Sequence, residues 1–145
     1  MRLALGCDHG GLRLKQHLKA VLIELGHTVD DVGTHDSKST DYPDYAEKVA
    51  RAVSAGEADR GVLVCGTGIG MSIAANKVSG VRAAVVSDAF SARMACEHND
   101  ARVLCLGERV VGTSLAELCL KAWLNAEFEG GRHSRRVNKI DALQP

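Results

Sequence analysis

A chain of 145 residues most simply forms one domain, and it can bury roughly 68–70% of its unfolded surface, so it needs neither disulfides nor a structural metal. Its 18 basic residues balance 18 acidic residues, which excludes a global field that would recruit nucleic acid or an acidic membrane. Five cysteines, an odd number, lie mostly in apolar segments, so we expect free thiols in a reducing cytoplasm.

The apolar pattern alternates between short strand-like runs and helix-period segments. In chain order it predicts a strand over Leu3–Cys7, a helix over Leu14–Leu25, a strand over Thr28–Val32, a helix over Tyr45–Ala55, a strand over Val62–Cys65, a helix over Ile69–Lys77, a strand over Val81–Val86, a helix over Ala89–His98, a strand over Val103–Leu106 and a helix over Ser114–Glu127. Such alternation is typical of a parallel sheet with helices on both faces. We predict a single α/β domain over 1–145: a Rossmann-like, doubly wound sheet of five mostly parallel strands in three layers.

Polar and glycine-rich segments follow four of the predicted strands. They are Asp8 to Gly11, Cys65 to Gly70, Ser87 with Asp88, and Gly107 to Arg109. Because ligands of open α/β sheets bind beyond the carboxyl ends of the strands, we expect these segments to converge on one site.

The stretch 61-GVLVCGTGIGMSIAANK-77 places three glycines at alternate positions directly after a strand. It is not a dinucleotide fingerprint, because the position of the third glycine holds Met71, and it lacks the spacing of a Walker loop. A phosphatase loop of cysteine, five residues and arginine fails at the same methionine. What remains is a loop of backbone N–H groups that opens onto a helix N-terminus, which favours a bound anion or oxyanion.

Cys65 begins this loop, where a helix N-terminus favours the reactive thiolate over the thiol. We therefore interpret Cys65 as a base or nucleophile at the rim of an anion site. The other four cysteines are interpreted as small core residues, because free cysteine commonly packs in that way. These are Cys7, Cys96, Cys105 and Cys119.

Six motifs then follow one another along the chain. They are G-C-D-H-G-G at 6–11, T-D-Y-P-D-Y-A at 40–46, C-G-T-G-I-G-M-S-I-A-A-N-K at 65–77, E-H-N-D at 97–100, G-E-R-V-V-G at 107–112 and E-G-G-R-H-S-R-R-V at 129–137. Together they resemble the ribose-5-phosphate isomerase B family, which also includes the galactose-6-phosphate isomerase subunits. Some members of that family lack the cysteine and carry a glutamate where this chain has Met71, so this chain resembles the cysteine type.

The resemblance implies a cytoplasmic enzyme of the pentose phosphate pathway that isomerises an aldose phosphate through a cis-enediolate, without a metal or an organic cofactor. Cys65 would be the base, with Thr67 in the catalytic set, while His98 would open the sugar ring with help from Asp8. The implied substrate contacts are, for the enediolate, Gly66, Gly68, Ile69 and Gly70; for the sugar, His9, Tyr42 and Asn99; and for the phosphate, Arg109, Arg132 and Arg136.

The basic C-terminal segment, 130–145, contains the only dense cationic cluster of a neutral chain. We interpret the glycine pair at 130–131 as a flexible joint that lets the segment reach a neighbouring active site, and Arg135 as a solvated residue. The resemblance implies a homodimer, possibly a tetramer, with sites at the subunit interface. Neither nucleic acid nor a membrane is an expected partner.

Three functions remain open on the sequence. The leading one is interconversion of ribose 5-phosphate and ribulose 5-phosphate. The second is isomerisation of a hexose 6-phosphate or of a free aldohexose of the allose or galactose type, because one hydroxymethyl group changes binding by only about 1–3 kcal/mol. The third is a non-catalytic sugar-phosphate-binding domain, which would not require a thiol beside its anion site.

Overall fold

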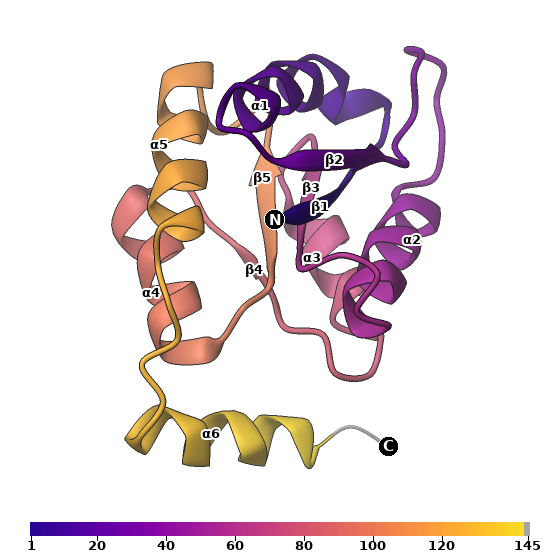
Figure 1. The fold of residues 1–145 in the computed structure, drawn as a ribbon. Helices are drawn as coiled ribbons and strands as arrows, with labels where there is room; N and C mark the ends of the chain where they lie inside the picture. Colours follow the sequence, from indigo (N-terminus) through magenta and orange to yellow (C-terminus); the bar gives the residue numbers. More distant parts are fainter. Residues whose placement is uncertain (144–145) are drawn as a thin grey trace.

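The computed structural model describes residues 1–143, which form an α/β domain around one sheet (Figure 1). Its strands are β1 (Arg2–Cys7), β2 (Thr28–Asp31), β3 (Arg60–Cys65), β4 (Ala83–Val85) and β5 (Val103–Gly107). They lie in the order β2-β1-β3-β5-β4, and every neighbouring pair is parallel. The strand order changes direction between β1 and β3, so the crevice beyond these two strands is where this fold binds ligands.

The helices are η1 (His9–Gly11, a 3₁₀ turn), α1 (Leu12–Glu24), α2 (Tyr42–Ser54), α3 (Ile69–Ala75), α4 (Ala89–Asn99), α5 (Thr113–Leu124) and α6 (Arg132–Asp141). The first five α-helices confirm the predicted ones, with boundaries shifted by a few residues. α2 begins three residues early because Pro43 fits the first turn, where its missing N–H has no intrahelical partner to lose. Among residues 1–143, no helix combines the length and apolar character needed to cross a bilayer.

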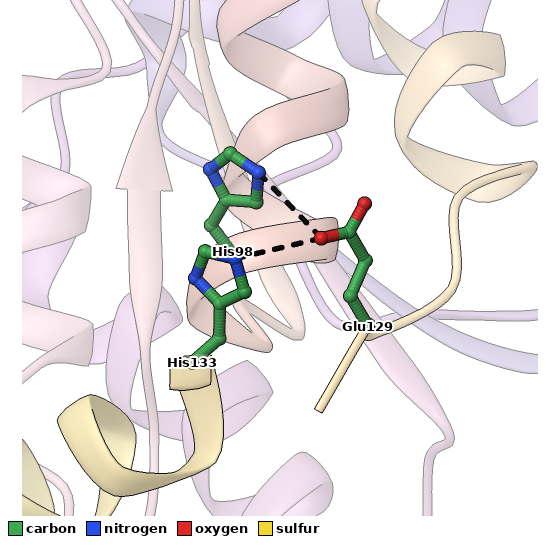
Figure 2. Close-up of side chains that lie close together, drawn as sticks. All are labelled: His98, Glu129 and His133. Carbon is green, nitrogen blue, oxygen red and sulfur yellow. Dashed lines mark ion pairs between the residues drawn. The ribbon is translucent and has the colours of Figure 1, made fainter. Parts of the chain in front are cut away.

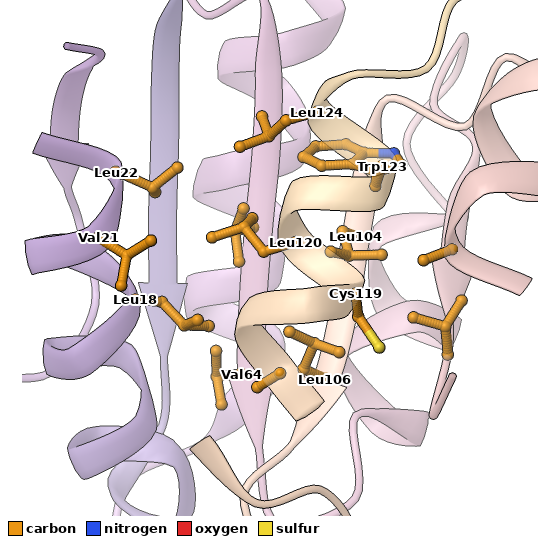
Figure 3. Packing of buried hydrophobic residues seen from close by; sticks show 14 of the residues in the cluster. Leu18, Val21, Leu22, Val64, Leu104, Leu106, Cys119, Leu120, Trp123 and Leu124 are labelled. Atoms are coloured by element: carbon orange, nitrogen blue, oxygen red, sulfur yellow. The ribbon is translucent and has the colours of Figure 1, made fainter. Parts of the chain in front are cut away.

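Two apolar clusters flank the sheet. On one face, α1, α4 and α5 pack on the strands, and Figure 3 shows Leu18 of α1 near Val64 of the sheet, with Leu120 and Trp123 of α5 near Leu104. On the other face, α2 and α3 pack through residues such as Met71. The three layers predicted from the sequence are therefore confirmed.

The alternation of side chains along β3 decides which layer receives the candidate base. Val62 and Val64 belong to the cluster under α1 and α5, whereas Leu63 and Cys65 belong to the cluster under α2 and α3. Successive residues of a strand point to opposite faces, so the last residue of β3 must lie on the α2–α3 side. Cys65 consequently lies on the face from which α3 begins.

A buried ion network fixes the end of β2 to α1. Lys15 is 1% exposed and donates to both carboxylate oxygens of Asp31, at 2.9 and 3.0 Å, and to the Thr34 carbonyl at 2.9 Å. Lys19 also donates to Asp31, at 3.0 Å. Burial acts to raise the pKa of Asp31, but the hydrogen bonds and charges of the two lysines outweigh it and hold the pKa below its ordinary value.

α6 was not predicted, because its sequence is almost entirely polar. Only His133 and Val137 of this helix are buried. Figure 1 shows α6 outside the three layers, beneath the end of α4, and Arg82 beside β4 pairs with Asp141 at 2.8 Å. Gly130 and Gly131 both have positive φ, 67° and 54°, and form the turn that starts α6, while their role as a flexible joint stays a prediction.

Candidate active site

Cys65 ends β3 and opens the glycine loop, as the sequence predicted. The Gly68 N–H donates to Cys65 Sγ at 3.1 Å, and such a donor stabilises negative charge on sulfur. Gly68 has φ +78°, a left-handed conformation that glycine adopts without strain. The cysteine is 5% exposed, so it lies deeper than the rim position expected from the sequence.

The loop glycines admit side chains that come from distant parts of the chain. A Cβ on Gly66 would lie 3.3 Å from Arg109 Nη1, and a Cβ on Gly70 would lie 2.7 Å from the ring of Tyr42. The backbone N–H of Arg109 also donates to the Gly66 carbonyl at 3.0 Å. Two of the predicted substrate contacts, Tyr42 and Arg109, are thus placed against the loop.

Two N–H groups of the loop already have partners within it. Gly68 donates to the thiol, and Ile69 donates to Thr67 Oγ1 at 3.3 Å. The end of β5 supports the same turn, because a Cβ on Gly107 would lie 2.6 Å from the Thr67 carbonyl carbon. Of the five N–H groups from Gly66 to Gly70, two are therefore already engaged, one by a thiol and one by a hydroxyl.

The turn after β1 lies against this loop across the crevice between β1 and β3. Asp8 is 8% exposed and accepts the Gly10 N–H at 2.8 Å. A Cβ on Gly10 would lie 3.3 Å from the backbone nitrogen of Gly66. His9 Nδ1 accepts the Thr40 N–H at 3.2 Å, so the proton of the neutral ring is on Nε2, where it can be donated to a ligand.

The other four cysteines are buried, as predicted for core residues. Burial raises the pKa of Cys7 to about 11, and it raises the pKa of each of the other three above the ordinary value. These three are Cys96, Cys105 and Cys119. A thiol with a raised pKa is a poor base at neutral pH.

His98 and Asn99 lie at the opposite edge of the sheet. Asp88 caps the start of α4 by accepting the Ser91 N–H at 2.7 Å, and the helix then runs back along the sheet. At its end, the Asn99 carbonyl accepts from Arg82 Nε at 2.9 Å, and Arg82 precedes β4. A helix of this length spans about 16 Å, so His98 is separated from Cys65 by the depth of the domain.

His133 and Glu129, to which the sequence pattern assigned no role, lie next to His98. The rings of His98 and His133 are stacked, with centroids 4.2 Å apart and an interplanar angle of 6°. Glu129 Oε2 lies 3.9 Å from His98 Nε2 and 3.4 Å from His133 Nε2 (Figure 2). Burial lowers the pKa of His133, and the neighbouring charges of His98 and Arg132 lower it further.

The predicted site residues thus form two groups within one chain. The group at the carboxyl edge contains Asp8, His9, Tyr42, the loop from Cys65 to Gly70, and Arg109. The group at the amino edge contains His98, Asn99, Arg132 and Arg136. Within a single chain the two groups do not meet, because α4 carries its last turn away from the crevice.

Comparison with known proteins relates this chain to a family of isomerases. Residues 3–140 match the family model described as ribose/galactose isomerase. Ribose-5-phosphate isomerase B of Escherichia coli strain K12 is 52% identical over 143 residues, covering 99% of this chain and 96% of its own length. A D-erythrulose-4-phosphate isomerase of Pectobacterium atrosepticum is 44% identical over 141 residues, covering 97% and 93%.

The fold agrees with the same relationship. A solved structure of ribose-5-phosphate isomerase B from Clostridium thermocellum superposes with a TM-score of 0.98 at 55% sequence identity, covering 99% of this chain and 97% of that one. The chain belongs to the ribose/galactose isomerase family.

Proposed function

We propose that this protein is an aldose–ketose isomerase that interconverts ribose 5-phosphate and ribulose 5-phosphate. One observation carries the proposal: the Cys65 sulfur receives the Gly68 N–H at 3.1 Å in a glycine loop, in a chain of the ribose/galactose isomerase family. A thiol held at a helix N-terminus supplies both a base and a stabilised negative charge. A module that only binds a sugar phosphate would need neither.

The reaction requires one proton to move between two carbons. The Cys65 thiolate removes the proton from C2, and the C–H electron pair forms the C1–C2 double bond of an enediolate whose negative charge is on oxygen. The thiol then returns the proton to C1 while the carbonyl forms at C2. We assign to Thr67, whose hydroxyl lies in the same turn, the exchange of a proton between the two oxygens.

Ring opening requires an acid–base group, and His98 has the chemistry for it. Because His98 lies at the amino edge, it cannot act on a sugar held by Cys65 of the same chain. We therefore propose that each site is completed by a second copy, which contributes His98, Asn99 and the two arginines of α6. In a two-fold dimer the contact is isologous, so two chains that meet with antiparallel strands place the carboxyl edge of one beside the amino edge of the other.

An exposed apolar surface supports such a contact. β4 is at the edge of the sheet, and Val85 of this strand is 43% exposed. Ile69 and Ile73 of α3 and Phe90 of α4 are 54%, 59% and 66% exposed. Val85 also lies beside the glycine loop, because a Cβ on Gly68 would be 2.9 Å from it. Large apolar side chains grouped around an edge strand are typical of a protein interface.

The phosphate would be bound by Arg109 of one chain together with Arg132 and Arg136 of the other. Arginine binds phosphate through paired, permanently charged donors. Both α6 arginines are exposed at the surface of the single chain, as residues that serve another subunit must be.

The experiment compares kcat/KM of the purified protein on ribose 5-phosphate, erythrulose 4-phosphate, allose 6-phosphate and galactose 6-phosphate. We expect ribose 5-phosphate to be preferred by about 10–200-fold over the hexose phosphates, the range that one hydroxymethyl group allows. A higher value on a hexose or tetrulose phosphate would transfer the assignment to that substrate. Binding of these compounds without turnover of any would favour the non-catalytic alternative.

A further inference from the structure

The contacts between His98, Glu129 and His133 differ from those of an ordinary surface ion pair. One nitrogen from each histidine and a carboxylate oxygen of Glu129 lie within 4.8 Å of one another, the only such group of three in residues 1–143. Figure 2 shows both histidines directed at the same oxygen of Glu129. The three residues come from different places in the chain: the end of α4, the segment before α6 and the first turn of α6.

The donor set suits a transition metal. Two imidazole nitrogens with one carboxylate oxygen are ligands that Zn²⁺ accepts, at about 2.0–2.2 Å from the metal. Ligand atoms of a tetrahedral zinc centre are therefore about 3.2–3.6 Å apart. The separations of 3.4 and 3.9 Å from Glu129 Oε2 to the two Nε2 atoms are close to this range. Rotation of the stacked rings about their Cβ–Cγ bonds would complete the approach.

The positions of His133 and Glu129 are fixed by packing and by a backbone hydrogen bond. His133 is 5% exposed, and the Glu129 N–H donates to the carbonyl of Glu97 at 3.0 Å, which anchors the segment to α4. One contact opposes a metal: Arg132 Nε donates to His133 Nε2 at 3.4 Å. Arg132 is exposed and has room to turn away from the nitrogen.

We propose that His98, Glu129 and His133 form a binding site for a divalent transition-metal ion of the zinc class. The ion would take the imidazole that the proposed reaction uses for ring opening, so the metal would act as an inhibitor and not as a cofactor. The inhibition rests on the proposed function. Metal binding itself does not, because it depends only on the geometry of the three side chains.

The binding experiment uses Co²⁺ as a visible probe for the zinc site. We expect the wild-type protein to bind one Co²⁺ per chain, with the intense d–d bands of a tetrahedral ion, and Zn²⁺ to displace it. Loss of even an outer-shell partner weakens metal sites by 10–100-fold, so Glu129→Gln and His133→Gln should each weaken binding at least about tenfold. Glu129 is exposed, so its variant remains informative even if the buried His133 substitution prevents folding.

Two controls separate this site from other metal ligands. His17→Ala removes a histidine that pairs with Glu117 at 2.7 Å and has no third ligand among residues 1–143, and it should leave the Co²⁺ bands unchanged. Cys65→Ser tests whether the metal lies on the thiol, and it too should leave them unchanged. Unaltered binding in Glu129→Gln, or loss of binding in Cys65→Ser, would overturn the proposal.

The activity experiment compares inhibition by Zn²⁺ with each protein's own uninhibited rate. Zn²⁺ should inhibit the wild type and His17→Ala equally, and Glu129→Gln should need at least about tenfold more metal, the same shift as in binding. EDTA should restore the rate fully and should not lower it before zinc is added. Metal binding without inhibition would leave the site in place and count against the role of His98, so the two proposals fail separately.

Discussion

Cys65 differs from the other four cysteines in what its sulfur contacts. Its Sγ accepts a backbone N–H at the start of α3, whereas burial, and after it the neighbouring charge of Cys65, raise the pKa of Cys105. Both belong to the same apolar cluster, so the difference lies in one hydrogen bond and in position at the end of a strand. We therefore assign reactivity to Cys65 from the contact of its sulfur, because all five cysteines are buried.

Cys65→Ala should abolish isomerisation while leaving the fold intact. Removal of a general base costs about 10²–10⁴-fold in rate, and kcat measured on ribose 5-phosphate gives the loss. Iodoacetamide should inactivate the wild type, and substrate should slow that inactivation. Cys119→Ala is the matched control, because it removes the same sulfur from the opposite face of the sheet and should keep normal turnover. Near-normal turnover by Cys65→Ala would refute the assignment.

The junction between α1 and β2 depends on the buried ion pair between Lys15 and Asp31, whose side chains are 1% and 6% exposed. Asp31→Asn leaves Lys15 buried opposite a neutral amide, and breaking a buried ion pair in this way costs about 3–5 kcal/mol in the free energy of unfolding. Urea denaturation at neutral pH measures the loss. Asp59→Asn is the control, since it breaks an exposed pair with Arg2 and should change stability far less.

The same carboxylate should make stability depend on acid. The folded pKa of Asp31 lies below its unfolded value of about 3.9, so its contribution is complete above that pH and is lost as the pH falls through the folded pKa. The stability gap between the wild type and Asp31→Asn should therefore narrow in strong acid. A gap that stays constant down to the acid transition would show that Asp31 acts through packing alone.

α6 provides a second test at the scale of one element, because three of its arginines are exposed but only two are assigned to phosphate. A charge-assisted hydrogen bond contributes about 1.5–3 kcal/mol, so Arg132→Ala or Arg136→Ala should lower kcat/KM on a sugar phosphate by about 10–150-fold. Turnover of a free sugar such as allose should change much less. Arg135→Ala, the same charge on the same helix, is the control and should have little effect.

Equal losses on free and phosphorylated sugars would give these arginines a different role. Arg132 and Arg136 would then maintain the subunit contact and not bind the phosphate. Size-exclusion chromatography of the variants distinguishes the two roles, because a contact residue lowers the dimer fraction and a phosphate ligand does not.

Because Cys65 and His98 lie at opposite edges of one chain, two inactive variants should regain activity when they form a mixed dimer. Cys65→Ala and His98→Asn should each be inactive alone. After joint unfolding and refolding, half of the dimers are hybrids with one complete site, so about a quarter of the wild-type activity should return. Failure to recover activity, with hybrid dimers demonstrated by mass spectrometry, would place His98 and Cys65 in the same chain's site.

The local sequence pattern was sufficient to predict most strands and helices of this molecule. Periods of two and of three to four residues predicted the strands and the first five α-helices, because burial on one face imposes them on the sequence itself. The glycine spacing around Cys65 predicted an anion loop, which stays a prediction, and the structure gives a steric reason for Gly70, where a Cβ would lie 2.7 Å from the ring of Tyr42. The core role of Cys105 also followed from its apolar neighbours.

Residues that are distant in the sequence are brought together only by the packing of whole elements. α6 has too few apolar residues for its helical spacing to be recognised in the sequence, and its Asp141 pairs with Arg82, which belongs to another part of the chain. The meeting of Glu129 and His133 with His98 results from that docking and has no local signature. The family motifs placed His98 in one site with Cys65, but the direction of α4 puts the two at opposite edges of the sheet. Sequence determines which residues carry the chemistry, whereas packing determines which of them one chain can bring together, because contacts across the fold depend on the directions of whole elements.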